Sequence, residues 1–427
     1  MSNLRKGLNL LKLLQSQWKS YEELKTLQNR KLKAILKFSY ENIPVYHKKF
    51  KQVKLKPEDI KTTEDLIKLP FLTKDELQNN YPKGIVSPLV DESKCWTSHT
   101  SGTSGKPITA VYDIKAEDFE KACALRPNLS CGQGLFDKWV VITSPEHIQD
   151  KTLNKKWFQR FGLFSQEYIS LFEDAKKQIS ILEKLNPEVL DGYSSSLYLI
   201  AKELKASGNN KIKPKIVYGT SDMLTNEMRT VINSAFDVEI YDQFGSVEMG
   251  RTAWECPKHS GYHIDMEAVV MEFIKDNAQV ASGERGEIVY TNLYNYAMPF
   301  IRYQIGDVGI FSDERCACGR GLPLMKIIEG RKTDFIKVPN GKVFPPNIWI
   351  VILMTHQIEQ YKVIQEKLDY FTIKIIPKSG FNKQSVEDIK NKAKNVLGDE
   401  VTIDIEIVDE IPREKSGKMI PIVSKVK

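Results

Sequence analysis

The middle of the chain alternates short apolar runs with helix-like segments, and this order of elements limits the possible folds more than any other feature. The strand-like and helix-like segments follow one another at 140–143, 172–185, 195–205, 215–220, 226–236 and 238–245. Strands that alternate with helical patterns are typical of a largely parallel sheet with helices packed on it. The sequence therefore predicts an α/β fold.

The pattern changes twice towards the C-terminus. From Tyr262, strand-like pieces at 266–274 and 286–293 predict a β-rich subdomain over about 250–330. A strand-like run, a lysine-rich helical pattern and a second strand-like run then follow at 371–377, 385–396 and 401–412. They predict a small α+β domain over 331–427, joined by a short hinge near Gly330 to a large domain over 61–330.

The first 60 residues form a basic helical arm. Met1 to Lys56 contain fourteen Lys or Arg and three Glu, a net charge of +11, whereas the whole chain carries +7. The remainder is therefore slightly acidic, which argues against a nucleic-acid-binding protein. Apolar residues at helical spacing predict a helix pair, and they are Leu4, Leu8, Leu11, Trp18, Leu32, Ile35 and Leu36.

Two interpretations of this arm stay open. It can pack on the large domain with a solvated lysine face, or it can touch the anionic inner face of a membrane. The sequence has no run of about 18 apolar residues and no apolar stretch typical of a secretory signal, so we expect a cytoplasmic protein. The oligomeric state is left open.

The stretch HTSGTSGKP, residues 99–107, has the composition of a phosphate-binding loop. Its hydroxyls, glycine backbone amides and lysine can surround phosphate oxygens, although its spacing differs from that of a Walker A loop. A flexible polar linker has a similar composition. The candidate phosphate ligands are Thr100, Ser101, Gly102, Thr103, Ser104, Gly105 and Lys106.

Four later stretches carry further candidates. YDQFGSVEMG, residues 241–250, ends a predicted strand and offers an aromatic ring, a tight turn and a carboxylate suited to Mg²⁺. MPFIRYQIGDVG, residues 298–309, places Asp307 in a turn. IEGRKTDFIK and PREKSGKMI contain Arg331 and Lys418. Taken singly, each stretch also has an ordinary structural interpretation.

In order, TSGTSGKP, FGSVE, YQIGD, GRKTD and SGK resemble the core motifs of the adenylate-forming superfamily of acyl-CoA synthetases and adenylation domains. NIPVYHKKF, LPFLTKDEL, GYSSSL and ECPKHSGYH further resemble its phenylacetate-coenzyme A ligase branch, including relatives encoded with capsular polysaccharide genes. The resemblance spans residue 40 to the end. It implies a large ATP- and acid-binding domain and a small C-terminal domain that moves between two poses.

The resemblance also implies roles for individual residues. Thr100 to Lys106 would hold the β- and γ-phosphates of ATP, Phe244 would stack on adenine, and Glu248 would help to place Mg²⁺. Gly245 and Ser246 would also contact ATP, with Ser246 offering the hydroxyl nearest to the position of Val247. Asp307 and Arg331 would bind the ribose, and Lys418 would be the catalytic lysine that bridges the substrate carboxylate and the α-phosphate. A mobile cation is needed because adenylation brings two anions together.

Three functions follow from this resemblance. The first is an ATP-dependent carboxylic-acid ligase that forms an acyl-adenylate and pyrophosphate and then transfers the acyl group to coenzyme A. The second transfers the acyl group to an amine or hydroxyl of a surface polysaccharide. The third is a non-catalytic scaffold, suggested only by Val247 in FGSVE and Thr333 in GRKTD, where the superfamily usually has a hydroxyl residue and Asp or Lys.

Three of the six cysteines lie close to histidines in a metal-binding pattern. Cys256-x-x-His259 and Cys316-x-Cys318 can each supply two ligands of one tetrahedral centre, and His263 is an alternative to His259. Related sequences with this pattern resemble zinc carriers, so we expect structural Zn²⁺; buried thiols are the alternative. Cys95, Cys123 and Cys131 are scattered and are expected to be buried thiols.

The acid itself is not determined by the sequence. We expect the acyl pocket to come from 141–147, 192–195 and 218–222, with His147, Tyr193, Gly219 and Ser221 as candidate contacts. Tyr193 and Tyr218 can equally belong to the core.

Overall fold

The computed structural model describes residues 2–99, 108–145, 148, 157–331, 335–344, 348–353, 357–414 and 419–426. The chain forms two compact units. The larger one comprises 1–305 and 309–327, and the smaller one comprises 306–308 and 328–427. The loop Thr100–Lys106, His147, Thr333 and Lys418 lie outside the described residues.

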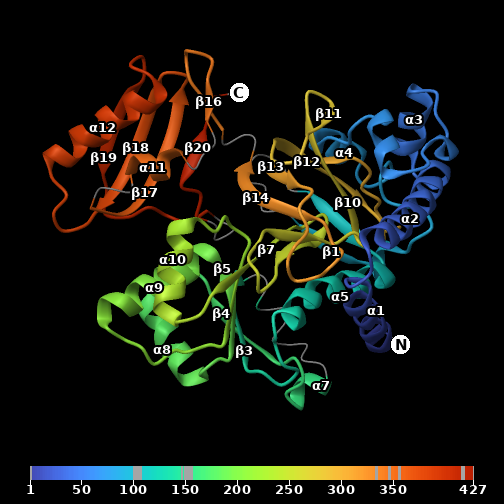
Figure 1. Cartoon of the computed structure of the whole chain (residues 1–427), viewed down its shortest axis with the longest axis horizontal. Coiled ribbons are helices and arrows are strands. Elements are labelled where there is room, and N and C mark those ends of the chain that lie inside the picture. Colours follow the sequence, from blue (N-terminus) through green and yellow to red (C-terminus); the bar gives the residue numbers. More distant parts are fainter. Residues whose placement is uncertain are drawn as a thin grey trace. The chain divides into compact units, whose positions relative to one another are not determined.

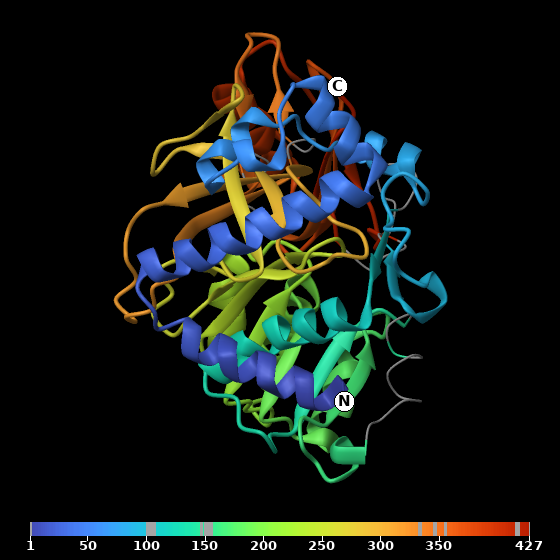
Figure 2. The ribbon, with the colours of Figure 1, turned by 90° about the vertical axis from the view of Figure 1, so that its right-hand side faces the viewer.

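The N-terminal arm consists of three helices, α1 (Ser2–Ser16), α2 (Tyr21–Asn42) and α3 (Pro44–Gln52). Ser20 and Glu23 form a reciprocal capping box that fixes the start of α2. The α2 residues Leu32, Ile35 and Leu36 are fully buried, as expected for a helix packed on the domain. Helices α1 and α2 face the viewer in Figure 2.

Helix α1 is turned differently from the expectation. It packs on α5 (Ile114–Ser130) through Leu10 and Leu13, whereas Leu4, Leu8 and Leu11 are 70%, 48% and 57% exposed. The interpretation in which Leu4, Leu8 and Leu11 pack on the large domain is therefore wrong: leucines occur on two sides of the helix, and spacing alone does not select the side that meets α5.

After the arm, the chain forms the short helix α4 (Lys74–Asn80) and a two-stranded sheet of β1 (Trp96–His99) and β2 (Thr109–Tyr112) before it enters the main sheet. Thr73 caps α4 by accepting a hydrogen bond from the Glu76 amide at 3.2 Å, which fixes the start of this helix.

One twelve-stranded sheet forms the centre of the larger unit (Figure 1). Its parallel part has the order β4-β3-β5-β6-β7. Helices α8, α9 and α10 pack on one face of it around buried residues such as Ile142, Leu197 and Phe236. The elements are β3 (Trp139–Thr143), α7 (Trp157–Arg160), β4 (Gln166–Ser170), α8 (Ala175–Leu185), β5 (Val189–Tyr193), α9 (Ser194–Ser207), β6 (Ile216–Thr220), α10 (Asn226–Phe236) and β7 (Ile240–Ser246).

The second part of the sheet continues from β7 in the order β8-β9-β14-β13-β12-β10-β11. The pairs β7–β8, β8–β9, β9–β14, β10–β12 and β10–β11 are antiparallel. The strands are β8 (Gly250–Glu255), β9 (Tyr262–Ile264), β10 (Val269–Lys275), β11 (Ala278–Gln279), β12 (Arg285–Asn292), β13 (Tyr303–Ser312) and β14 (Leu324–Arg331). Strand β7 therefore joins a parallel half to an antiparallel half.

The smaller unit contains a four-stranded sheet in the order β19-β18-β17-β20. Its core comprises Trp349 of α11, Phe371 and Ile373 of β18, and Ile389 of α12. The elements are β15 (Ile336–Lys337), β16 (Val343–Phe344), α11 (Ile348–Leu353), β17 (Ile358–Lys367), β18 (Tyr370–Pro377), α12 (Lys383–Leu397), β19 (Thr402–Ile407) and β20 (Ile422–Ser424). The expected α/β class with a separate small C-terminal domain is confirmed.

Candidate active site

The FGSVE stretch forms the tight connection between β7 and β8. A Cβ on Gly245 would lie 2.3 Å from the carbonyl oxygen of Gly250, and Gly250 itself has a φ of +65°. Both positions therefore require glycine. The turn that they form places Glu248 at the junction of the parallel and antiparallel halves, with the residue only 7% exposed.

Three tyrosine hydroxyls hold this turn. Tyr303 donates to Oε1 of Glu248 at 3.1 Å. Tyr112 donates to the carbonyl oxygen of Val247 at 3.2 Å, and Tyr294 donates to that of Met249 at 3.1 Å. Burial raises the pKa of Tyr112 and of Tyr294 well above the usual tyrosine value, so both remain neutral donors. Within the described part of the chain, one hydrogen bond thus orients the carboxylate of Glu248, and its backbone is fixed on both sides.

The other expected nucleotide contacts are only partly described. Phe244 and Ser246 lie on β7 and are half-buried, and the Ser246 hydroxyl has no hydrogen-bond partner among the described residues. Asp307 lies on β13 in the smaller unit and is half-buried. Arg331 ends β14, but its side chain lies outside the described residues.

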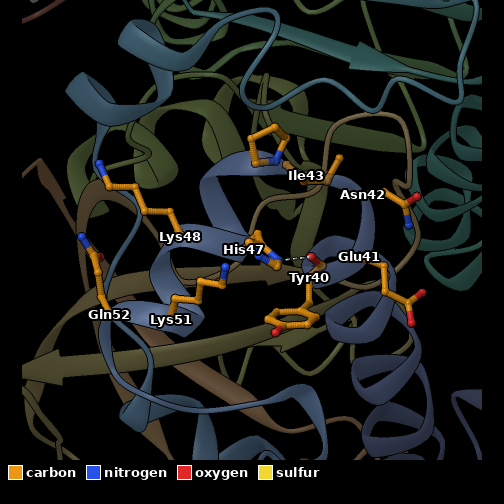
Figure 3. Close-up of a pocket in the computed structure, with 9 residues that line it drawn as sticks. Tyr40, Glu41, Asn42, Ile43, His47, Lys48, Lys51 and Gln52 are labelled. Atoms are coloured by element: carbon orange, nitrogen blue, oxygen red, sulfur yellow. Dashed lines mark hydrogen bonds between the residues drawn. The ribbon is translucent and has the colours of Figure 1, made fainter.

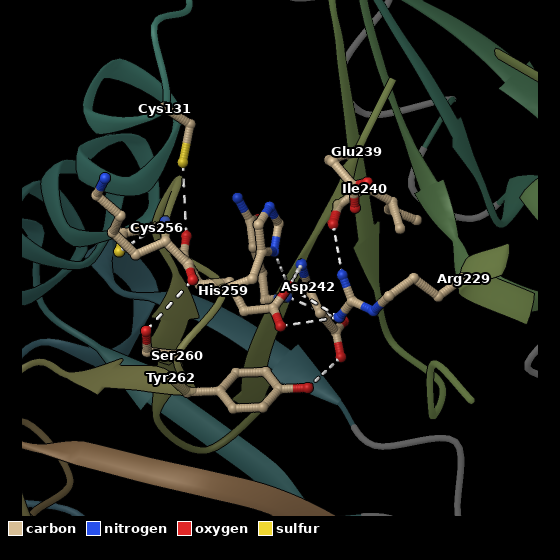
Figure 4. Close-up of polar contacts among 12 residues, drawn as sticks. Cys131, Arg229, Glu239, Ile240, Asp242, Cys256, His259, Ser260 and Tyr262 are labelled. Carbon is tan, nitrogen blue, oxygen red and sulfur yellow. Dashed lines mark hydrogen bonds and ion pairs between the residues drawn. The ribbon is translucent and has the colours of Figure 1, made fainter. Parts of the chain in front are cut away.

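A buried polar network lies where β7 changes partners (Figure 4). Asp242 pairs in register with Gly219 of β6, and the next residue, Gln243, pairs with Trp254 of β8. The amide of Asp242 donates to Oε2 of Glu255 at 2.8 Å, and its carboxylate accepts from the Tyr262 hydroxyl at 2.6 Å.

Glu255 is itself held by a cation. Arg229 of α10 donates from one nitrogen, Nη2, to its two oxygens at 2.8 and 2.9 Å. Burial, with the negative charge of Glu255 added, raises the pKa of Asp242 to about 7. Burial alone would raise the pKa of Glu255 as well, but His259 and Arg229 lower it overall. The network therefore keeps Glu255 ionised and Asp242 close to its titration point at neutral pH.

Four metal-type ligands meet on the other side of β8. The ligand atoms of Cys256, His263, Cys316 and Cys318 all lie within 4.8 Å of one another. The two sulfurs of Cys256 and Cys316 are 3.6 Å apart, and Cys318 Sγ is 3.3 Å from His263 Nε2. His259 is not part of this group, because its Nδ1 lies 3.4 Å from Glu255 and its ring stacks on Tyr241.

The protonation states suit metal binding. Burial lowers the pKa of His263 to about 4, so its imidazole is neutral at pH 7. Burial raises the pKa of Cys318, but hydrogen bonds with the backbone and side chain of Arg320 outweigh this and lower it overall. Burial raises the pKa of Cys256 to about 12. A metal ion would deprotonate that thiol on binding.

The turn between α1 and α2 packs over this cluster. The amide of Gly321 donates to the Gln17 carbonyl, and Arg320 Nε donates to the Gln17 side chain, both at 3.0 Å. The Arg320 guanidinium also lies 4.5 Å from the centre of the Trp18 ring. Leu24 shares a small core with Cys256 and Cys316. The cluster thus joins the arm to the antiparallel half of the sheet.

The candidate acyl contacts lie at different depths. Tyr193 is buried in the core beneath α8 and α9, with 7% of its surface exposed. Gly219 leaves no room for a side chain, since a Cβ there would lie 2.9 Å from the Ser194 hydroxyl. Ser221 follows β6 with a φ of +71°, a strained conformation for serine. Gly219 and Ser221 therefore lie at the carboxyl ends of the parallel strands, where such sheets bind ligands.

A separate pocket of about 760 Å³ lies at the junction of α2 and α3 (Figure 3). His47, Lys48 and Lys51 line it beside Tyr40, whose carbonyl oxygen is 3.1 Å from His47 Nδ1. None of the residues expected to bind nucleotide or metal lines this pocket.

The sequence interpretation missed the residues that support the site. Tyr303 and Asp242 both lie inside the YQIGD and YDQFG stretches, so a search of the same stretches for hydrogen-bonding side chains could have found them. Tyr112, Tyr294 and Arg229 lie in segments with no such pattern, and only the fold brings them to the turn.

Comparison with known proteins agrees with the motif series. The family model for the CapK C-terminal domain matches residues 338–425. A phenylacetate-coenzyme A ligase of Thermus thermophilus is 25% identical over 89% of this chain and 86% of its own length. Protein CapK of Staphylococcus aureus is 24% identical over 95% of this chain and 92% of its own.

The fold is shared with a solved 2-hydroxyisobutyryl-CoA ligase in complex with an acyl-AMP. The TM-score is 0.79 at 17% sequence identity, and the match covers 96% of this chain and 91% of that one. The resemblance to the adenylate-forming superfamily, and within it to phenylacetate-coenzyme A ligases and CapK, is therefore confirmed.

Proposed function

We propose that this protein is an ATP-dependent carboxylic-acid ligase. The observation that carries the proposal is the hydrogen bond from Tyr303 to the buried Glu248, because it joins YQIGD to FGSVE at the end of β7. A carboxylate oxygen of the acid attacks the α-phosphorus of ATP and pyrophosphate leaves. The thiol of coenzyme A then attacks the acyl carbon, loses its proton, and AMP leaves.

The chain's own residues divide this work. Glu248, fixed by the three tyrosines, is suited to hold Mg²⁺, which neutralises phosphate charge when bound. Phe244 is suited to stack on adenine. The glycine-rich loop Thr100–Lys106, Asp307, Arg331 and Lys418 keep the roles that the resemblance implies.

Release of pyrophosphate tests this proposal. Purified protein is given ATP, Mg²⁺ and a panel of aliphatic, aromatic and hydroxy acids. We expect at least one acid to release pyrophosphate, and Lys418→Ala to abolish this release while ATP binding persists. A folded, ATP-binding protein that is silent with every acid would refute the ligase, and full turnover in Lys418→Ala would refute its assignment.

The acceptor is the second question, and the resemblance to relatives encoded with capsular polysaccharide genes allows an alternative to coenzyme A. An amine or hydroxyl of a surface sugar can take the acyl group from the same adenylate. Mass spectrometry of the product separates the two: an acyl-CoA thioester supports the first, and an amide or ester that forms only with the sugar acceptor supports the second.

We further propose that the cysteine cluster holds a structural zinc ion. Zinc–sulfur and zinc–nitrogen bonds of about 2.3 and 2.0 Å in a tetrahedron place sulfurs about 3.8 Å apart and sulfur about 3.5 Å from nitrogen. The observed separations of 3.6 and 3.3 Å fit these values. Cys256, His263, Cys316 and Cys318 supply four ligands, which leaves no open position for catalysis.

We propose that the protein acts in the cytoplasm and touches the inner face of the membrane through its arm. ATP and coenzyme A are present in the cytoplasm, and its reducing conditions suit the six free cysteines. None of the described helices is both long and apolar enough to cross a membrane. The exposed leucines of α1, with Lys12 and Lys19 beside them, suit peripheral contact with anionic lipid. Flotation with anionic vesicles, lost in Leu8→Glu, would support this contact; no flotation would refute it.

A further inference from the structure

The hairpin of β8 and β9 connects the cysteine cluster to the strand that carries Phe244. Glu255 and Tyr262 are directly opposite each other in the β8–β9 register. Cross-strand partners point to the same face of a sheet, and both of these residues bind Asp242. Asp242 precedes Phe244 by two residues on β7. The hairpin therefore holds β7 at Asp242 by two hydrogen bonds from its side chains.

The next residue on each strand points to the cluster instead. Cys256 follows Glu255, and His263 follows Tyr262, so the alternation of side chains along a strand puts these two ligands on the other face. The same hairpin thus offers two ligands to the cluster and two hydrogen bonds to Asp242. An ion that fixes the ligands restricts the hydrogen-bonding pair at the same time.

This part of β7 changes strand partners at Asp242. At Asp242 the strand leaves β6, and its pairing with β8 starts only at Gln243. The Asp242 amide is satisfied by the Glu255 side chain rather than by a neighbouring strand. Glu255 is oriented by Arg229, and its backbone carbonyl accepts from the Cys131 thiol at 3.5 Å. Phe244, which pairs with Ala253 of β8, therefore lies on the segment that the hairpin contacts.

We infer that Glu255 and Tyr262 are positioning residues for the nucleotide, and that metal in the cysteine cluster strengthens nucleotide binding through them. The inference rests on the proposed ligase function and on the proposed zinc ion. A zinc ion in the cluster would then do more than stabilise the fold, because its occupancy would also change the affinity of the protein for ATP.

The test measures nucleotide affinity without turnover. Isothermal titration with α,β-methylene-ATP and Mg²⁺ is carried out on the full chain, zinc-loaded or stripped with a zinc-selective chelator that leaves Mg²⁺ in solution. Zinc content and thermal unfolding are measured on the same samples. The variants are Tyr262→Phe and, as the matched control, Tyr290→Phe, a buried tyrosine that bonds Thr252 at 2.9 Å.

We expect Tyr262→Phe to keep its zinc and to bind the nucleotide about tenfold more weakly, as loss of one bond to a buried carboxylate implies. Its KM for ATP rises while kcat and the KM for coenzyme A change little. Stripping zinc weakens binding in the wild type and in Tyr290→Phe, but less in Tyr262→Phe, because the two changes act through the same contact.

Equal nucleotide affinity in loaded wild type and loaded Tyr262→Phe would overturn the positioning role. Equal affinity in loaded and stripped wild type would overturn the link to the metal, as would effects of stripping and substitution that simply add. These results leave the ligase proposal standing if loaded wild type binds the nucleotide and releases pyrophosphate. A loaded wild type that binds no nucleotide would refute the ligase proposal itself.

Discussion

Replacing Tyr303 by phenylalanine removes the one hydroxyl of the described residues that orients the Glu248 carboxylate. Tyr303 is 1% exposed and Glu248 is 7% exposed, so water cannot easily take the place of the lost donor. A hydrogen bond to a charged group contributes about 1.5–3 kcal/mol. If the transition state uses the whole of it, kcat/KM for ATP falls by about 10- to 150-fold.

The assay is pyrophosphate release at saturating acid, with ATP and Mg²⁺ varied. We expect the defect in Tyr303→Phe to shrink as Mg²⁺ rises, because excess cation compensates for a misoriented carboxylate. Tyr290→Phe is the matched control, since it removes a buried tyrosine hydroxyl that bonds the neutral Thr252. Wild-type kcat/KM in Tyr303→Phe at low Mg²⁺ would refute the reasoning, provided that urea unfolding shows a folded variant.

Three other predictions concern stability. The Arg126 guanidinium is fully buried and pairs with Asp265 and Glu267. Arg126→Met leaves these two buried carboxylates without this cation and should lower the free energy of unfolding in urea by about 3–5 kcal/mol. A decrease below about 1 kcal/mol would contradict this prediction. The pKa of Asp242 is raised to about 7 in the folded protein, so between about pH 4 and 7 this carboxyl ionises in the unfolded chain but stays protonated in the folded one. The free energy of unfolding of the wild type therefore falls over that window, and Asp242→Asn should gain stability relative to the wild type as the pH rises. A difference in unfolding free energy between the two proteins that does not change with pH would refute the raised pKa. Removing zinc, or Cys316→Ser, should lower the melting temperature of the larger unit, and a metal-free protein with unchanged melting would exclude the structural ion.

Local patterns were sufficient for much of the fold. The helical pattern at 226–236 predicts the bounds that α10 has. In the structure Thr225 caps this helix by accepting a hydrogen bond from the Met228 amide. Helix α5 was missed, since its sequence has no dominant apolar face and contains Pro127 near its end. It is buried between α1 and the sheet, so tertiary packing stabilises a segment that periodicity does not reveal.

The sequence by itself determined which chemistry the chain can perform. The motifs FGSVE and YQIGD and the two cysteine pairs follow one another in a fixed order along the chain, and this order is visible without the fold. The tertiary structure decided which histidine joins the cysteines. His259 has the tighter spacing to Cys256, but the β8–β9 register turns His263 to the cluster and leaves His259 with Glu255. It also decided that Tyr112, Tyr294 and Tyr303, far apart in the chain, meet at the Glu248 turn. Contacts between distant segments depend on strand pairing, and spacing along the chain does not contain that information.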